Sequence, residues 1–252
     1  MNNIYNLSGK IALVTGGSEG IGYGIAEQFL SLGARVVITA RNSEKLNLAQ
    51  EKLGANCFTY INDVSNLEEL PGLVKDIEKN IGPIAILVNN AGCHLKQDSL
   101  TVSDEQFEQV VNINLNAVFA LTREVLKVMI VHKAGSVINI SSMSALFGLT
   151  QVVAYSSSKT ALLGLTRSLA SEYSHTGVRI NAIAPGFIES KMFLNVMEND
   201  PERKKKILGR TPAGRFGKPA DIGKAAAFLA SDASEFITGI CLPVDGGNSI
   251  GF

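Results

Sequence analysis

Short apolar runs rich in β-branched residues alternate with longer amphipathic segments along most of the chain. The runs at residues 36–38 and 86–88 contain only valine, isoleucine and leucine. Such continuous runs are typical of strands buried on both faces of a parallel sheet, because a half-exposed strand would alternate apolar with polar residues. The pattern therefore predicts a doubly wound α/β fold, in which helices cover both faces of one sheet.

Seven runs are predicted to be strands of this sheet. They cover residues 11–15, 35–39, 57–61, 84–89, 136–140, 179–184 and 241–244. The amphipathic segments predict helices over residues 21–32, 43–53, 67–80, 103–131, 154–174 and 220–231. Ser103, with Gln106 three residues later, fits a capping box at the start of one helix. Since no linker or repeat divides the chain, we expect a single domain over residues 1–252.

The composition excludes several kinds of partner. Lys and Arg number 23, as do Asp and Glu, so the formal net charge is zero, and 46% of the residues are hydrophobic. A chain this apolar is not intrinsically disordered, and without an excess of cations it is not expected to bind nucleic acid. The longest uncharged stretch, residues 134–158, contains Asn139, Tyr155 and several serines. It is too polar to span a bilayer, so no membrane association is expected.

The cysteines and histidines indicate neither disulfides nor a metal site. Cys57, Cys93 and Cys241 are an odd number and lie far apart in the sequence. This usage favours a reducing compartment, and we expect the protein to be cytoplasmic. The histidines show no metal-ligand spacing, and we expect no catalytic metal.

A glycine-rich turn, TGGSEGIG at residues 15–22, follows the first predicted strand and opens the first predicted helix. Glycines allow the chain to turn tightly and let a pyrophosphate approach the N–H groups at the helix start. Such a turn also serves ordinary helix packing, but its place between strand and helix favours dinucleotide binding in a Rossmann fold. The predicted contacts of this turn are Gly16, Ser18, Glu19, Gly20, Ile21 and Gly22.

The spacing of these glycines begins a resemblance to the short-chain dehydrogenase/reductase family, which further motifs extend along nearly the whole chain. These are NNAG at 89–92, Asn114 within VNINL, Ser142 after the fifth strand, YSSSK at 155–159 and PGFI at 185–188. The resemblance implies an NAD(P)-dependent oxidoreductase that interconverts a ketone and a secondary alcohol. It also implies a homotetramer that assembles through the helices containing Asn114 and Tyr155.

Tyr155 and Lys159 are the predicted catalytic pair. They lie four residues apart in a helical segment, so their side chains share one face. A nearby cation lowers the pKa of a phenol, and Tyr155 could then exchange a proton with the substrate oxygen while hydride is transferred. Without the other motifs the pair would be interpreted as a buried ring and a solvated amine. The resemblance gives the same catalytic roles and adds Ser142 as partner of the substrate oxygen and Asn114 as holder of a proton-relaying water.

The cofactor is predicted to be NADP(H). Ala40 occupies the position at the end of the second strand where a carboxylate would bind the ribose of NAD, and Arg41 follows it. A guanidinium suits phosphate geometry, which favours a 2′-phosphate. Glu19 stands where many NADP-dependent relatives have a base, and it could pair with Arg41 or repel the phosphate. NAD(H) therefore stays possible.

The resemblance implies further cofactor contacts, of which Ser190 is a mild departure because the family commonly has threonine there. Lys159 would also reach the ribose hydroxyls, and Ile188 would offer its backbone to the nicotinamide carboxamide. The full set is Asp63 and Val64 at the adenine, Asn89 and Gly92 at the ribose side, Ile188 at the nicotinamide, and Ala91, Pro185, Gly186 and Ser190 as further cofactor contacts.

The substrate is predicted to be a small carbonyl compound or alcohol, in contact with Ser142, Ser144, Tyr155 and His94. A Cys93-His94 nucleophile is disfavoured, because adjacent side chains in extended backbone point apart. Residues 189–217 follow a strand's carboxyl end, where ligands bind in such sheets, and we expect a substrate lid there. The basic run at 203–206 is interpreted as a solvated helix face, with contact to an acidic substrate as the alternative.

Two other functions stay open. Reductases of 3-oxoacyl groups on an acyl carrier protein share these motifs, as do dehydrogenases of sugar acids. A protein of another class would sense NADP(H) without turnover. The four predicted catalytic residues argue against a sensor, since binding alone would not require Tyr155 together with Lys159.

Overall fold

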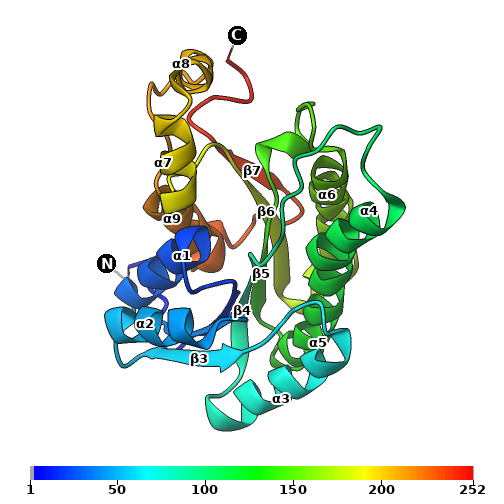
Figure 1. The fold of residues 1–252 in the computed structure, drawn as a ribbon. Coiled ribbons are helices and arrows are strands. Elements are labelled where there is room, and N and C mark those ends of the chain that lie inside the picture. Colours follow the sequence, from blue (N-terminus) through cyan, green and yellow to red (C-terminus); the bar gives the residue numbers. More distant parts are fainter. Residues whose placement is uncertain (1–2, 252) are drawn as a thin grey trace.

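The computed structural model describes residues 3–251, except for the side chains at 191, 192, 195 and 196. Its strands form one parallel seven-stranded sheet in the order β3-β2-β1-β4-β5-β6-β7 (Figure 1). The strands are β1 (Ile11–Thr15), β2 (Arg35–Ala40), β3 (Cys57–Ile61), β4 (Ile84–Asn89), β5 (Gly135–Ile140), β6 (Val178–Pro185) and β7 (Cys241–Val244). The doubly wound sheet is confirmed, and each strand lies within one residue of its predicted bounds.

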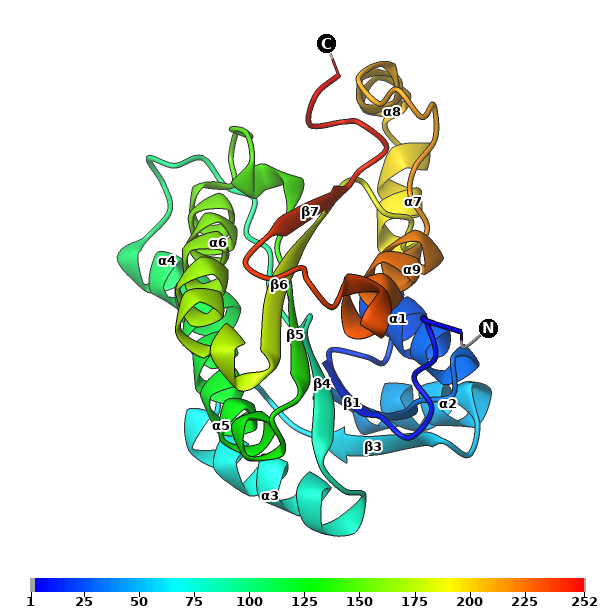
Figure 2. The same ribbon diagram turned by 180° about the vertical axis from the view of Figure 1, so that it is seen from behind.

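Helices cover both faces of the sheet, as Figures 1 and 2 show from opposite sides. One face carries α1 (Gly20–Ser31), α2 (Ser43–Leu53) and α9 (Pro219–Ala230). The other carries α3 (Leu70–Asn80), preceded by η1 (Leu67–Glu69), together with α4 (Asp104–Val111), α5 (Ala117–His132) and α6 (Val153–Tyr173).

The alternation of side chains along each strand divides the hydrophobic core into two layers. In β1, Ala12 and Val14 pack in the layer that contains Phe29 of α1, while Ile11 and Leu13 pack in the other. Because successive residues of a strand point to opposite faces, an apolar run of this kind serves both layers at once.

The predicted helix over residues 103–131 is interrupted. Its start is as expected, with Ser103 and Gln106 forming the capping box of α4. A π-helical turn, η2 (Asn112–Asn116), then separates α4 from α5. Such turns occur frequently at functional sites, and this one contains Asn114.

Residues 189–217 contain two helices that the sequence pattern did not delimit, α7 (Lys191–Glu198) and α8 (Pro201–Gly209). Asp200 caps α8 by accepting a 3.0 Å hydrogen bond from the backbone of Arg203. Met197, Ile207 and Phe216 form a small hydrophobic cluster between these elements. The segment is closed at its base, where Ile188 and Gly217 form a parallel bridge.

The uncharged stretch at 134–158 is part of the folded domain. It comprises β5, the short helix η3 (Met143–Ala145), a loop and the start of α6. No helix within residues 3–251 has both the length and the apolar character that crossing a bilayer requires.

Candidate active site

The glycine-rich turn is held in place by side chains of its own strand and of the neighbouring one. Thr15 Oγ1 accepts 3.0 Å hydrogen bonds from the backbone N–H groups of Asn90 and Ala91. The side-chain amide of Asn90 donates to the carbonyls of Thr15 and Gly16. The turn therefore depends on Asn90, which the sequence analysis did not select.

Two glycines of this turn show why side chains are excluded from it. A Cβ at Gly22 would lie 2.3 Å from the carbonyl oxygen of Gly16, which no small shift can relieve. Gly20 has a φ of +59°, a backbone conformation that suits glycine, and a Cβ there would meet nothing within 4 Å. The start of α1 is thus open on the side where a pyrophosphate could approach its N–H groups.

A cleft of about 520 Å³ extends from this turn along the carboxyl ends of β2, β3 and β4. Eight of the predicted cofactor contacts line it: Gly16, Ser18, Glu19, Arg41, Asp63, Val64, Ala91 and Gly92. The cleft lies beside the point where strand order reverses between β1 and β4, the usual ligand site of such sheets. Other lining residues include Thr39, Asn42, Lys45, Asn62 and Cys93, which the sequence analysis did not select.

Two buried polar groups of this cleft suit the adenine half of a dinucleotide. The side-chain oxygens of Thr39 and Asn62 are buried without a hydrogen-bond partner among the described residues. Buried polar atoms are normally paired, so an unpaired amide oxygen at a cleft wall indicates a donor supplied by a ligand. Asp63 is differently placed, because hydrogen bonds from Ser65 to one carboxylate oxygen lower the pKa of its carboxyl.

The charges at the end of the cleft differ from the predicted arrangement. Glu19 does not pair with Arg41 but forms an ion pair with Lys45, whose Nζ lies 3.0 Å from both carboxylate oxygens. Arg41 lies 3.9 Å from Asp63, and its side chain is 76% exposed. Lys45 in the first turn of α2 faces the glycine loop, so its charge offsets the repulsion expected from Glu19. The cleft offers two cations, Arg41 and Lys45, to a phosphate.

Asn89 has a different role from the predicted ribose contact. Its side-chain amide donates to Thr122 of α5 and to Asn139 of β5, both at 2.9 Å. Asn139 in turn donates to Thr166 of α6. This buried chain of hydrogen bonds joins the sheet to two helices, and Asn90 lines the cleft instead.

The predicted cofactor contacts near the nicotinamide begin at Pro185, the last residue of β6, and continue beyond the strand. Gly186 is required because a Cβ there would lie 2.6 Å from the Cα of Asp245. The bridge beside Ile188 is made by the carbonyl of Phe187 and the N–H of Glu189, so it does not use the N–H or carbonyl of Ile188 itself. Ser190 Oγ accepts a hydrogen bond from the backbone of Phe193 and thereby helps to start α7.

The predicted catalytic pair lies at the start of α6. Lys159 is 4% exposed, its Nζ donates a 2.8 Å hydrogen bond to the carbonyl of Ile140, and burial lowers its pKa to about 8. Its ammonium lies 5.8 Å from the centre of the Tyr155 ring. Contrary to expectation, the pKa of Tyr155 is raised, because burial disfavours the phenolate by more than a hydrogen bond with Ser142 favours it.

The two adjacent serines after β5 have separate roles. Ser141 Oγ donates to the carbonyl of Lys159 and is buried within the fold. Ser142 caps η3 by accepting from the backbone of Ser144, and its hydroxyl acts on the Tyr155 phenol to lower its pKa. This geometry favours Ser142, the predicted residue. The Ser144 hydroxyl is buried and has no partner among the described residues.

Asn114 is fully buried and holds the wall opposite Lys159. It accepts a hydrogen bond from the N–H of Cys93 and donates to the carbonyl of Cys93 and to Ser158 Oγ. A Cβ at Gly92 would lie 2.9 Å from Asn114 Oδ1 and 3.5 Å from Lys159 Nζ. Because this side chain is committed to Cys93 and Ser158, its predicted link to a water would run through the main chain of the π-helical turn.

His94 lies against the predicted catalytic tyrosine. The ring centres of His94 and Tyr155 are 4.6 Å apart at an angle of 52°. Burial, followed by the charges of Lys96 and Arg203, lowers the pKa of His94. Burial raises the pKa of the neighbouring Cys93 thiol, which disfavours a thiolate nucleophile.

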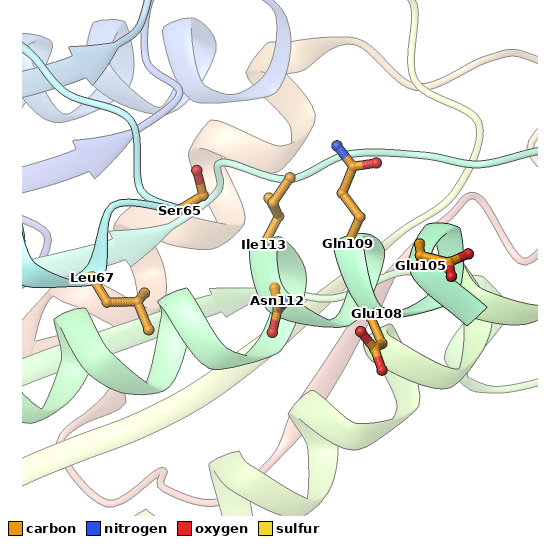
Figure 3. A pocket seen from close by; sticks show the side chains of 7 residues that line it. All are labelled: Ser65, Leu67, Glu105, Glu108, Gln109, Asn112 and Ile113. Carbon is orange, nitrogen blue, oxygen red and sulfur yellow. The ribbon is translucent and has the colours of Figure 1, made fainter. Parts of the chain in front are cut away.

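A second hollow lies outside this arrangement. It has a volume of about 440 Å³. Figure 3 shows the side chains that line it, between the β3–α3 connection and α4: Ser65, Leu67, Glu105, Glu108, Gln109, Asn112 and Ile113. None of the predicted catalytic side chains lines it. Within the described part of the chain, no three His, Cys, Asp or Glu side chains gather as a metal site requires.

Comparison with known proteins agrees with this geometry. Over residues 16–249 the chain matches the family described as enoyl-(acyl carrier protein) reductase. It is 43% identical, over 96% of its length and 98% of the relative's, to the 3-oxoacyl-[acyl-carrier-protein] reductase FabG of Rickettsia bellii (strain RML369-C). It is 37% identical, over 98% of both chains, to the 5-keto-D-gluconate 5-reductase of Escherichia coli (strain K12).

A solved structure extends the likeness to the whole fold. The crystal structure of a gluconate 5-dehydrogenase from Burkholderia cenocepacia J2315, in complex with NADP and tartrate, matches with a TM-score of 0.93 and 31% identity. The match covers 99% of this chain and 98% of that one. The chain therefore belongs to the short-chain dehydrogenase/reductase family and is an oxidoreductase that interconverts a ketone and a secondary alcohol by hydride transfer with a nicotinamide cofactor.

Proposed function

We propose that this protein is an NADP(H)-dependent reductase of a small ketone, and that Tyr155, Lys159, Ser142 and Asn114 carry the reaction. The observation that supports this most directly is the meeting of Ser142, Lys159 and His94 around the Tyr155 ring, next to the cleft that fits a dinucleotide. When bound, the nicotinamide ring supplies or accepts the hydride.

The protein's own residues handle the proton. Tyr155 is kept protonated by burial, so it is ready to donate to a carbonyl oxygen in the reduction direction. Ser142, whose hydroxyl acts on the phenol, holds the same substrate oxygen. Lys159 supplies positive charge beside the phenolate that forms. The π-helical turn at Asn114 holds the water through which the proton of Tyr155 is replaced.

NADP(H) is proposed over NAD(H) because Ala40 leaves no carboxylate to repel a 2′-phosphate, while Arg41 and Lys45 face the cleft. The B. cenocepacia relative was crystallised with NADP. Gly16, Ser18, Gly20, Ile21 and Gly22 would hold the pyrophosphate. The nicotinamide would lie by Pro185, Gly186, Ile188 and Ser190, and the adenine by Asn62, Asp63 and Val64.

A second candidate substrate is a 3-oxoacyl group on an acyl carrier protein. The 43% identity to the R. bellii reductase favours it. The 5-keto-D-gluconate reductase and gluconate 5-dehydrogenase relatives favour a sugar acid instead. The two candidates differ in size, since a carrier protein needs a docking surface and a sugar acid needs only the pocket.

The test is a panel of ketones and alcohols, each assayed with NADP(H) and, in parallel, with NAD(H). The absorbance of the reduced cofactor reports turnover. The panel includes a keto-sugar acid and a 3-oxoacyl thioester, both free and carrier-bound. We expect kcat/KM with NADPH to be at least ten times kcat/KM with NADH. Tight NADPH binding without turnover of any member would contradict the proposal and favour a sensor.

We further propose a cytoplasmic homotetramer, in which residues 189–217 act as the substrate lid. The exposed apolar side chains of Phe119 and Val131 on α5 and of Val153 on α6 support assembly through these helices. The three cysteines are free thiols, which suits a reducing compartment.

A further inference from the structure

Residues 245–251 form a tight turn beside α8, here named the C-terminal turn (Figures 1 and 2). Asp245, the residue after β7, closes it by accepting hydrogen bonds from the backbone N–H groups of Gly247 and Ser249, at 2.9 and 2.8 Å. Asn248, in the middle of the turn, is only 2% exposed. The last residues of a domain are usually loosely held, so a deeply buried amide indicates that this turn is tied to another part of the fold.

The C-terminal turn is tied to the end of α8 by two buried hydrogen bonds in series. Asn248 Nδ2 donates a 2.8 Å hydrogen bond to Thr211 Oγ1. The Thr211 hydroxyl in turn donates at 2.8 Å to the carbonyl of Ile207, which belongs to the hydrophobic cluster that α7 and α8 share. Asn248 is therefore linked through Thr211 to the core of the proposed lid.

Backbone contacts hold the same stretch after α8. The N–H of Ala213 donates a 3.0 Å hydrogen bond to the carbonyl of Gly246. A Cβ at Gly251 would overlap the carbonyl oxygen of Arg210, so the two backbones lie in direct contact there. Residues 210–213 are thus attached to the C-terminal turn in addition to their attachment at the base of the segment.

This attached stretch connects the two sides of the predicted active site. The guanidinium of Arg210 lies 4.5 Å from the centre of the ring of Phe147. Phe147 is in the loop that follows η3, the short helix that Ser142 caps. On the cofactor side, the C-terminal turn packs against Gly186, where a Cβ would lie 2.6 Å from the Cα of Asp245. The turn therefore lies between the predicted nicotinamide contacts and the end of α8.

We propose that Asn248 is a positioning residue for the substrate, because through Thr211 it fixes the end of α8 and keeps Arg210 on Phe147. The proposal rests on the function proposed above and refines its lid, of which residues 189–209 move while 210–213 stay attached to the C-terminal turn. A lid that is held in place loses less conformational entropy when the substrate binds. Loss of the Asn248 link should therefore weaken ketone binding and leave the hydride-transfer step unchanged.

The first test measures reduction of 5-keto-D-gluconate and of a free 3-oxoacyl thioester by NADPH, with the purified full-length protein. In Asn248→Ala we expect KM for the better ketone to rise about tenfold, as for the loss of one buried hydrogen bond. The kcat and the Kd for NADPH should stay within twofold of wild type, which shows that the fold is retained. Thr211→Val removes the same bond from its other side and should give the same rise, whereas Thr211→Ser keeps the hydroxyl and should keep the wild-type KM.

Two further variants separate a link between two residues from a general loosening of the fold. Residues that act through one bond are coupled, so the double variant Asn248→Ala/Thr211→Val should raise KM no more than either single variant. Independent effects would instead multiply to about 100-fold. Ile250→Ala is the matched control, because it removes an 80% exposed side chain from the same turn and should leave KM unchanged.

The second test does not depend on activity. The basic run at residues 203–206 is divided, because Arg203 is half-buried while Lys204, Lys205 and Lys206 are exposed, as expected for a solvated helix face. Trypsin cleaves beside these lysines only when α8 opens locally, so the rate of cleavage reports how firmly the helix is held. Asn248→Ala should increase this rate about tenfold, and Ile250→Ala should not. The fragments are identified by mass spectrometry.

The outcomes separate this proposal from the one on which it rests. If KM is unchanged in Asn248→Ala, or if the Kd for NADPH rises as much as KM, the positioning role is wrong and the reductase function stands. Unchanged cleavage at the lysines would refute the attachment of α8 to the C-terminal turn. If the wild type reduces no ketone of the panel, the reductase function is wrong and the positioning role falls with it, while cleavage still decides whether the turn holds α8.

Discussion

The two halves of the cleft are built in different ways. The cofactor half is formed by backbone, with Thr15 and Asn90 fixing the glycine loop and Gly22 packed so closely that a Cβ there would lie 2.3 Å from the carbonyl oxygen of Gly16. The predicted substrate half is formed by side chains, among them His94 and Phe147 on loops and Arg210 on the 189–217 segment.

This difference predicts how each half tolerates change. Where backbone surrounds a ligand, one added methyl group alters the shape for every ligand. Where side chains surround it, a substitution alters charge or contact at one position and the rest of the pocket is kept. We therefore expect single substitutions in the cofactor half to abolish cofactor binding or leave it unchanged. Single substitutions in the substrate half should alter substrate preference gradually.

The largest effect is expected at Tyr155, where the two halves meet. Tyr155→Phe removes the proton donor while keeping the ring that packs on His94. We expect kcat to fall by about 10³-fold or more, with the Kd for NADPH nearly unchanged. Retention of a tenth or more of wild-type turnover would contradict the assigned role.

The next effect tests the backbone-built half. Gly22→Ala should weaken NADPH binding by more than tenfold, because its Cβ overlaps Gly16 O and the Asn90 amide. Gly9→Ala is the control, since Gly9 also has a positive φ, of +78°, and does not line the cleft, and a Cβ there meets nothing within 4 Å, so only the left-handed backbone is penalised, by about 1 kcal/mol. The chain has no tryptophan, so NADPH fluorescence is free of energy transfer from indole. Equal losses in both variants would refute the steric argument.

A third effect concerns the buried cation of the site. The pKa of Lys159 in the folded protein is about 8 against an ordinary 10.5, so the unfolded chain binds more protons between these values. Burial of the ammonium therefore costs stability below pH 8, and this cost disappears as pH rises from 8 to 10.5. Relative to Lys159→Met, the wild type without cofactor should gain on the order of 2 kcal/mol in urea unfolding between pH 7.5 and about 10.5. If the free energy of unfolding changes equally with pH in the wild type and in Lys159→Met, the lowered pKa of Lys159 is contradicted.

The smallest effect refines the charge balance at the cofactor's phosphate. Lys45→Ala should lower the preference for NADPH over NADH by about tenfold, and Glu19→Gln should raise it a few-fold by releasing Lys45. Lys52→Ala, at the other end of α2, is the control. If Lys45→Ala leaves the preference for NADPH over NADH unchanged, Lys45 does not contribute to it, and Arg41 is the residue that sets the preference.

Sequence patterns predicted the sheet well because its strands are continuous apolar runs, and they predicted the glycine loop because its chemistry is local. They assigned the wrong asparagine to the cleft. Alternation along β4 could have corrected this, since Asn89 falls on the same face as Leu87, toward α5. Lys45 was missed because its importance depends on how α2 packs beside the glycine loop, where Lys45 meets Glu19 from 26 residues away in the sequence.

Other features had no readable signal. The π-helical turn adds one residue to a helix without changing its apolar pattern much, so the 103–131 segment appeared continuous. The raised pKa of Tyr155 depends on how deeply the ring is buried, which residue spacing does not report. The split of the basic run depends on the rotation of α8, which is set by the contact of Ile207 with Met197 and Phe216.

The bridge between Ile188 and Gly217 makes the segment between them an exchangeable unit. Its two ends are already joined side by side, so replacing the intervening residues with a longer or shorter stretch changes the closure entropy only slowly. A graft of this segment from a relative with another substrate would keep the anchor, the glycine loop and the Tyr155–Lys159 pair. Such a junction would allow the substrate specificity of this chain to change without rebuilding its proposed catalytic residues.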